Sequence, residues 1–234
     1  MKTNPAMRRG FTLVELLVVI VIIAALAGLT APMVIRQRKK ADQTEAVSNA
    51  RQIGLALFEF ETAYGSFPDK STATTVTENT GTQLTFSGTA SNDYFRQLIA
   101  AEISQSEAMF YCKTAFSKKP DNVLNTTATA LAAGEVGYAY LLNTDTAFST
   151  AGNPARPILA APLAYPFQTG QFDSDMYDAK AVILKIDNSV TSVPILKTTK
   201  LAQLGGGKNL LQTGDDTVWG TGVVPTFVNP LDKK

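Results

Sequence analysis

The stretch MRRGFTLVELLVV, residues 7–19, places a single carboxylate inside an otherwise apolar run. From Leu16 to Ile35, 20 consecutive residues carry no charge. At about 1.5 Å per residue such a helix spans roughly 30 Å, the thickness of the hydrocarbon core of a bilayer. A carboxylate such as Glu15 costs about 2.5–3.5 kcal/mol there, unless it has a partner or reaches interfacial water. The stretch therefore predicts a membrane-spanning helix with an unusual charge near its start.

A secretory signal peptide is the main competing interpretation of this segment. Signal peptides have apolar stretches of about 7–15 residues that end at a small-residue cleavage site. The run here is longer, although the small residues between Ala24 and Ala31 could mimic such a site. The positive-inside rule leaves the orientation open, because basic residues flank the run on both sides. They are Lys2, Arg8 and Arg9 before it and Arg36, Arg38, Lys39 and Lys40 after it.

The sequence RRGFTLVELLVVIVIIAALAGLTAP, residues 8–32, resembles the N-terminus of type IV pilins and of type II secretion pseudopilins. The resemblance implies that residues 1–10 are a basic leader and that a prepilin peptidase cuts between Gly10 and Phe11. It also implies that the new amino group of Phe11 is N-methylated. Glu15 and Pro32 match the glutamate and the proline that this family uses in its assembly segment.

Cleavage at this site gives Phe11 an ammonium group four residues before Glu15. Such an ammonium can neutralise the carboxylate, within one chain or from a neighbouring subunit, and the attraction is stronger where water is excluded. The resemblance implies the second arrangement, in which the pair sets the register of subunits in a helical filament. The implied partners are further copies of the chain, other pseudopilins, the prepilin peptidase, an inner-membrane assembly platform and the membrane itself.

An apolar stripe continues beyond the membrane run, with members three or four residues apart. It consists of Val47, Ala50, Ile53, Leu57, Phe60 and Tyr64. We expect one helix from Phe11 to Tyr64, kinked or locally melted at Pro32 because proline removes a backbone hydrogen bond. The expected parts are a cleaved leader at 1–10, a transmembrane half-helix at 11–35, an amphipathic half at 36–64 and a globular head at 65–234.

A second segment, LALFEFETAYGSFPD at residues 55–69, resembles the end of the long helix in major pseudopilins. The pattern of the head predicts an antiparallel sheet packed on the helix, which together give an α+β fold, the pilin fold. We expect a hairpin within 179–196, a strand within 135–143 and an edge strand within 156–164, which prolines punctuate.

The remaining segments of the head give less regular patterns. Residues 70–92 are rich in Thr, Ser and Gly, which indicates an exposed loop with a short strand at 83–86. A helix is expected from Ser91 or Asn92 to Ile103, followed by a buried strand or tight turn at 107–112. Residues 204–234 are expected to be irregular.

Composition excludes several kinds of chemistry. The 234 residues include no histidine, which removes Ser-His-Asp triads and histidine-bound zinc. The single cysteine, Cys112, cannot form an internal disulfide and is interpreted as a buried apolar residue, with a reactive or intermolecular thiol as the alternative. The net charge of +1 gives no general electrostatic reason to expect nucleic acid as a partner.

The segment GDDTVW, residues 214–219, is similar to the calcium loop of major pseudopilins. It makes Asp215 and Asp216 calcium candidates, although calcium takes six to eight oxygen ligands and only two acids are clustered here. The alternative is a turn with Trp219 packed on the sheet. No other cofactor is expected.

Together these features predict a structural subunit of a type II secretion pseudopilus or type IV pilus-like filament, and not an enzyme. Its expected location is the bacterial inner membrane, crossed once, with the head in the periplasm. An adhesin or binding module on a pilin-type stalk is the alternative. A membrane-anchored hydrolase is a third candidate, because Asp173, Asp175 and Asp178 supply several carboxylates in a short stretch.

Overall fold

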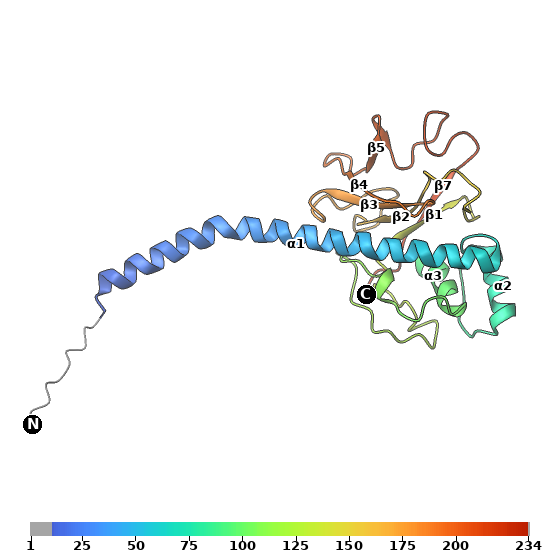
Figure 1. The fold of residues 1–234 in the computed structure, drawn as a ribbon, viewed down its shortest axis with the longest axis horizontal. Helices are drawn as coiled ribbons and strands as arrows, with labels where there is room; N and C mark the ends of the chain where they lie inside the picture. The colour runs from blue at the N-terminus through green and yellow to red at the C-terminus, as the bar shows by residue number, and fades with distance from the viewer. Residues whose placement is uncertain (1–10, 234) are drawn as a thin grey trace, which may run out of the picture. The chain divides into compact units, whose positions relative to one another are not determined.

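A computed structural model of the chain describes residues 11–233, shown as a ribbon in Figure 1. The chain divides into two compact units, of which the first ends at Lys39 and the second begins at Lys40. Helix α1 (Leu13–Tyr64) contributes to both units.

The first unit consists of the N-terminal part of α1. All residues from 11 to 38 are exposed, and the helix contains an 18-residue window of mean hydropathy 2.8. It is therefore long and apolar enough to cross a membrane. α1 is helical through Pro32, so of the two outcomes expected at this proline, a kink or local melting, local melting does not occur. The missing N–H costs one hydrogen bond, which the turns on either side tolerate.

The second unit is built on a five-stranded antiparallel sheet in the order β4-β3-β2-β1-β7. Its strands are β1 (Ala139–Asn143), β2 (Pro157–Ala161), β3 (Lys180–Lys185), β4 (Val190–Pro194) and β7 (Pro225–Val228). A separate two-stranded sheet pairs β5 (Gln203–Gly205) with β6 (Lys208–Asn209). The long helix and this sheet confirm the predicted α+β, pilin-like architecture.

Of two predictions about strands, one is confirmed and the other is wrong. The predicted hairpin is confirmed, because β3 and β4 pair from Lys180↔Pro194 to Leu184↔Val190. The edge position predicted for residues 156–164 is wrong, because β2 lies between β1 and β3. Pro157 is its first residue and Pro162 follows its last, so neither proline interrupts the ladder.

The strand on the far side of β1 comes from the C-terminal stretch that we expected to be irregular. β7 pairs with β1 over four residues, from Tyr140↔Val228 to Asn143↔Pro225. The prediction of a short strand at 83–86 is wrong, since these residues have no strand partner.

Residues 70–80 form a helix, α2 (Lys70–Thr80), where we expected an exposed loop. Asp69 caps it: its Oδ1 accepts hydrogen bonds from the backbone N–H groups of Ser71, at 2.8 Å, and of Thr72, at 2.9 Å. Thr72 Oγ1 accepts in return from the Asp69 N–H at 2.8 Å. This reciprocal capping, with Gly81 in the left-handed region at the other end, outweighs the low helix propensity of threonine.

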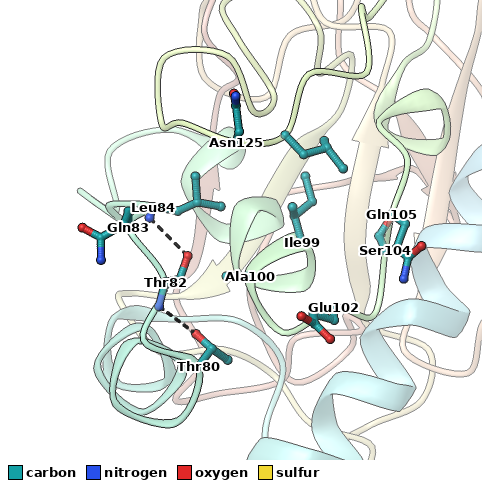
Figure 2. A pocket seen from close by; sticks show the side chains of 11 residues that line it. Thr80, Thr82, Gln83, Leu84, Ile99, Ala100, Glu102, Ser104, Gln105 and Asn125 are labelled. Carbon is teal, nitrogen blue, oxygen red and sulfur yellow. Dashed lines mark hydrogen bonds between the residues drawn. The ribbon is translucent and has the colours of Figure 1, made fainter.

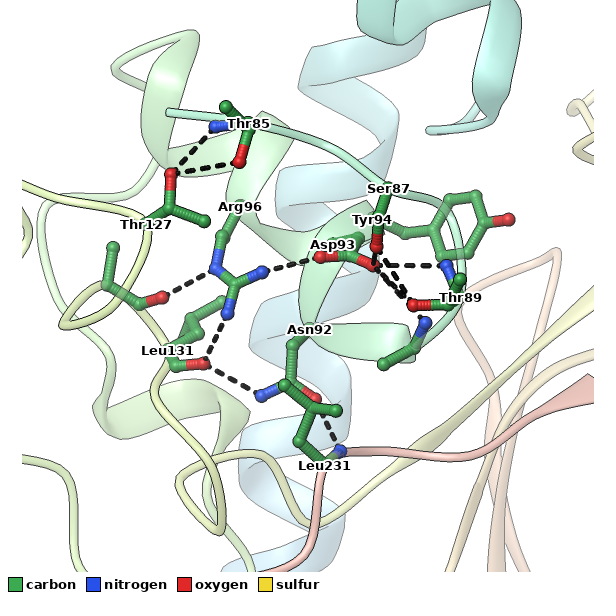
Figure 3. Close-up of polar contacts among 12 residues, drawn as sticks. Thr85, Ser87, Thr89, Asn92, Asp93, Tyr94, Arg96, Thr127, Leu131 and Leu231 are labelled. Atoms are coloured by element: carbon green, nitrogen blue, oxygen red, sulfur yellow. Dashed lines mark hydrogen bonds and ion pairs between the residues drawn. The ribbon is translucent and has the colours of Figure 1, made fainter. Parts of the chain in front are cut away.

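Helix α3 (Ser91–Ala100) ends three residues before the predicted Ile103. Residues 107–112, where we expected a buried strand or a tight turn, contain a short 3-10 helix, η1 (Ala108–Phe110), which is a single tight turn and not a strand. Figure 3 shows how α3 is held by polar contacts. Arg96 pairs with Asp93 at 2.5 Å and donates to the carbonyls of Ala130 and Leu131 at 2.7 and 3.1 Å.

The core of the second unit lies between α1 and the sheet. Along α1, Ala50, Ile53, Leu57 and Phe60 are fully buried, whereas Val47 and Tyr64 pack at the edge of the core. The Tyr138 hydroxyl donates to the carbonyl of Ala46, also in α1, at 2.7 Å. Each large apolar side chain buried in this way contributes about 1.5–3 kcal/mol. The stripe predicted beyond the membrane run is therefore the face that fixes α1 on the sheet.

The cap of α2 gives a pH-dependent prediction. Burial opposes ionisation of Asp69, but hydrogen bonds from Thr72, Ser71 and Ala147 outweigh it and lower the pKa of its carboxyl. A lowered pKa stabilises the fold above the unfolded value of about 3.9, and this contribution disappears as the pH falls through the folded pKa. We expect Asp69→Ala to lower the free energy of unfolding by about 1–2 kcal/mol at pH 7.

The measurement is urea unfolding of a chain that begins at residue 36, at neutral pH and near pH 3. The difference between Asp69→Ala and the unsubstituted chain should shrink on acidification. The control is Asp175→Ala, because Asp175 is exposed and should have little effect at either pH. An Asp69→Ala effect of the same size at both pH values would show that the carboxylate charge is not involved.

Candidate processing and assembly site

The first turn of α1 holds the carboxylate of Glu15 with a neighbouring threonine. Glu15 Oε2 accepts hydrogen bonds from the backbone N–H and the hydroxyl of Thr12, both at 2.8 Å. The Glu15 N–H donates to Thr12 Oγ1 at 3.2 Å. This is a capping box, with Thr12 at the N-cap and Glu15 three residues later.

The capping box gives Glu15 a role within its own chain. It satisfies N–H groups that have no partner inside the helix, and it places a negative charge at the positive end of the helix dipole. The sequence analysis missed it, although the order Thr-Leu-Val-Glu before an apolar run is its usual signature. The carboxylate thus has polar partners near the start of the apolar run.

The other residues predicted for processing and assembly lie on either side of this turn. Gly10 falls outside the described residues, so the structure does not show the predicted cleavage bond. Phe11 lies two residues before α1, and 82% of its surface is exposed. Pro32 lies inside α1, where its ring faces no buried core because the surrounding residues are exposed.

The apolar part of α1 is uncovered by the rest of the described chain. Between Leu13 and Ile35 its large apolar side chains are 47–81% exposed. Apolar area stabilises a structure by roughly 25 cal/mol for each Å² removed from water. A surface of this extent requires lipid or apolar helices of other molecules around it, and both are consistent with a membrane anchor.

The calcium candidates Asp215 and Asp216 lie in an exposed turn between β6 and β7. Lys208 donates to Asp216 Oδ2 at 2.5 Å, and this hydrogen bond, together with the lysine charge, lowers the pKa of the Asp216 carboxyl. One of the two carboxylates is therefore paired with an ammonium group. Two carboxylates supply at most four of the six to eight oxygen ligands that calcium takes. Calcium at Asp215 and Asp216 therefore stays a prediction, in which the ion would have to displace the Lys208 ammonium and take its remaining oxygen ligands from backbone carbonyls and water.

Trp219 packs into the head next to this turn. It is 1% exposed, its Nε1 donates to the carbonyl of Leu210 at 2.7 Å, and its ring stacks on Phe148. This agrees with the alternative interpretation, a turn fixed by a buried tryptophan.

A second set of carboxylates was not noticed in the sequence. Carboxylate oxygens of Glu107, Asp121 and Glu135 lie within 4.8 Å of one another. Among the described residues, the candidates Asp173, Asp175 and Asp178 do not form such a cluster. Glu107 accepts from the backbone N–H groups of Leu131 and Asn122, at 2.6 and 2.7 Å.

These carboxylates hold backbone in place. Glu135 accepts from the Ala132 N–H at 2.7 Å and lies 3.3 Å from the ammonium of Lys118. Burial raises the pKa of Glu107, although its two backbone hydrogen bonds oppose the shift. Glu107 and Glu135 therefore hold parts of the long segment that connects η1 with β1.

The head also contains a polar groove and a buried thiol. A groove of about 500 Å³ lies between the segments 80–84, 99–105 and 124–125, and its lining in Figure 2 shows hydroxyls, amides and one carboxylate, that of Glu102. Cys112 is fully buried, and burial raises its pKa to about 12. A reactive thiol needs the opposite environment, so Cys112 fits the interpretation as a core residue.

Comparison with known proteins gives one match that is placed in the same N-terminal segment and two further relatives. The family described as the prokaryotic N-terminal methylation motif matches residues 5–31. The chain is pseudopilin-like. It is 39% identical over 61 residues to the type II secretion system core protein G of Pectobacterium carotovorum subsp. carotovorum. It is 52% identical over 42 residues to the type II secretion system core protein G of Escherichia coli strain K12.

These similarities of the pseudopilin-like chain cover 26% and 18% of its length. The chain spans about two fifths of the first relative and three tenths of the second, 39% and 29% of their lengths. No solved structure matches the chain. The comparisons therefore cover a minority of the chain.

The ion pair in the turn predicts a calcium-independent head. We expect the same melting temperature in excess calcium and in excess chelator, because Lys208 already supplies a positive charge to Asp216. Lys208→Ala should change the melting temperature only slightly, since exposed ion pairs contribute about 0–1 kcal/mol. A clear rise in melting temperature with calcium, absent in Asp216→Asn, would show that the ion displaces the lysine.

Proposed function

We propose that this chain is a structural subunit of a type II secretion pseudopilus. The proposal rests on one observation: the methylation motif lies on a capped, apolar helix whose surface the chain leaves exposed. The two relatives named as type II secretion core proteins support this system over an adhesive pilus. In this proposal α1 anchors the chain in the inner membrane, and the head lies on the periplasmic side.

The first proposed step is removal of the leader by a prepilin peptidase. Hydrolysis of the bond between Gly10 and Phe11 consumes one water molecule and leaves a carboxylate on Gly10 and an ammonium on Phe11. Transfer of one methyl group from a methyl donor to this amine keeps its positive charge. The new ammonium then lies only one residue before Thr12, the N-cap of α1.

The second proposed step is pairing between subunits. The Phe11 ammonium of one subunit neutralises Glu15 of its neighbour, as the helices pack side by side in the membrane. Both hydrogen bonds from Thr12 go to one carboxylate oxygen, Oε2, and they hold the group in a fixed orientation at the helix start. A correctly docked neighbour therefore meets a pre-oriented charge, and a subunit shifted along the axis does not.

The proposed work of the assembled subunits is mechanical. Helix packing would replace lipid around the apolar run with the runs of neighbouring copies. The head would remain outside the hydrocarbon region. Further pseudopilins and an inner-membrane assembly platform are the proposed partners, and no catalytic step is assigned to the chain.

The processing step is tested by the intact mass of the protein extracted from membranes. We expect a species that begins at Phe11 and carries one added methyl group. A species that keeps residues 1–10, or one cut between Ala24 and Ala31, would contradict the proposed processing. Gly10→Val should block cleavage and serves as the control for the assignment of the site.

The pairing step is tested by substitutions that separate charge from capping. Glu15→Gln keeps an acceptor for the Thr12 N–H, because glutamine also completes a capping box, but it removes the charge. Glu15→Ala removes both. Thr12→Val removes the hydroxyl and keeps the charge. We expect both Glu15 variants to be processed and inserted normally but to be lost from filaments, while Thr12→Val still assembles.

The readout is the amount of each variant in sheared filaments relative to its amount in membranes. Normal incorporation of Glu15→Gln would contradict the charge pairing. Equal losses in Thr12→Val and Glu15→Gln would assign the effect to the cap.

A further inference from the structure

We propose that the head carries a basic surface which docks on anionic phospholipid headgroups. This surface, called the basic end, is formed by six exposed lysines of the second unit. They are Lys40, Lys113, Lys118, Lys119, Lys180 and Lys233.

The six lysines gather around the first turns of the helix in the second unit. One hollow there is lined by Asp42 and Glu45 of α1 and by Lys113, Lys118 and Lys119. A second hollow is lined by residues 40–47 of α1 together with Asp178 and Lys180. Lys233 joins the first group, because its ammonium donates to the carbonyl of Ser117 at 3.2 Å, and Ser117 lines the first hollow.

Acidic groups at the basic end neutralise only part of this charge. Lys113 pairs with Asp42 at 2.8 Å, and Lys118 lies 3.3 Å from the buried Glu135. The side chains of both lysines remain about half exposed, at 53% and 47%. With Glu45 and Asp178 also counted, six lysines face four carboxylates.

The basic end contrasts with the rest of the head. From Lys40 to the C-terminus the sequence has 15 Lys and Arg against 19 Asp and Glu, a net charge of −4. The opposite end of the same helix is acidic. It carries Glu59 and Glu61, and the adjoining α2 region carries Asp69 and Glu78 with Lys70, which pairs with Asp145. The charges of the head are therefore separated along its own helix.

Chain connectivity places the basic end near a bilayer surface, if the apolar run spans the membrane as the proposed function requires. Lys40 follows Ile35, the last residue of the run, by five residues. Five residues reach at most roughly 18 Å when extended, and about 8 Å when helical. The headgroup region on each side of the hydrocarbon core is about 5–8 Å deep. The first turn of the head therefore cannot leave the neighbourhood of the headgroups.

Charge at this distance acts on lipid directly. Near an anionic surface each lysine raises the affinity about fivefold, and the effect falls off within a Debye length of about 8 Å. Lysine suits this partner, because its ammonium is a flexible, hydrated point charge that needs no fixed acceptor geometry. The acidic end of the head is repelled by the same surface. The two effects together orient a membrane-held subunit with its basic end on the lipid.

The experiment uses a chain that begins at residue 36, so it lacks Gly10, Phe11 and Glu15. This part folds alone, because every buried apolar residue of the described chain lies between Ala46 and Val228. The measurement is flotation with vesicles of about three parts phosphatidylcholine to one part phosphatidylglycerol, and with vesicles of phosphatidylcholine alone. We expect binding to the anionic vesicles only, and its loss in high salt.

Two triple variants with the same change in net charge show whether vesicle binding depends on the basic end or on net charge alone. The test variant replaces Lys113, Lys118 and Lys119 by Gln, and we expect its vesicle affinity to fall at least tenfold. The control variant replaces Lys70, Lys185 and Lys208 by Gln, and we expect its affinity to change less than twofold. Circular dichroism melts establish that both variants are folded.

Three results would overturn the proposal. They are no binding of the unsubstituted head to anionic vesicles, equal losses in the two triple variants, and self-association of the head without vesicles that the test variant abolishes. The last result would show that the basic end binds the acidic end of another copy and not lipid. Because the head lacks the processing site, none of these results depends on whether the chain is cleaved or assembled.

Discussion

The uncovered apolar surface of α1 is the constraint on which the rest of the structure depends. A single helix has an N-terminal part that buries nothing and a C-terminal part whose stripe is almost fully buried. The second part gains its stability from the sheet. The first part must gain it from outside the chain, in lipid or against other helices. An assembly function follows from this difference more directly than from any pocket or side-chain cluster in the head.

The first turn of this helix takes part in two interactions, a capping box within one chain and the proposed pairing between chains. Within one chain Glu15 completes a capping box with Thr12, so its charge is useful before any neighbour arrives. In the proposed filament the same charge distinguishes the correct register from all others. A residue that only completed the capping box at the third helical position could be replaced by glutamine. A carboxylate at this position adds what an amide cannot supply, a full charge fixed in position at the start of the apolar run.

Much of the fold could be predicted from periodicity, and the failures have identifiable causes. The long helix, its buried stripe and the β3–β4 hairpin follow from regular spacing of apolar residues. α2 was missed because its composition is threonine-rich, and its stability comes from Asp69, Thr72 and Gly81 at its ends. β7 was missed because a four-residue strand shows no reliable alternation, and its place is set by pairing with β1.

The site shows a similar division. Phe11, Glu15 and Pro32 were predicted from a motif of contiguous residues, which sequence displays completely. The buried carboxylates Glu107 and Glu135 were not, because they meet only after the chain between η1 and β1 has folded. The lysines of the basic end come from four separate segments, so the sequence alone does not show that they gather on one surface. Sequence thus predicts chemistry that is local along the chain and misses chemistry that the fold assembles.

Polar side chains hold the long connections of the head in place. Small domains often use disulfides or metal ions for this purpose. One cysteine rules out an internal disulfide, and in the turn at residues 214–219 Asp216 pairs with Lys208. The long connections are held instead by side chains that bond backbone. Arg96 and Glu107 both bind the segment at residues 130–131, one through carbonyls and the other through an N–H. Opposite charges on the two faces of this segment satisfy both kinds of backbone group, so an irregular loop remains buried without unpaired polar atoms along that stretch.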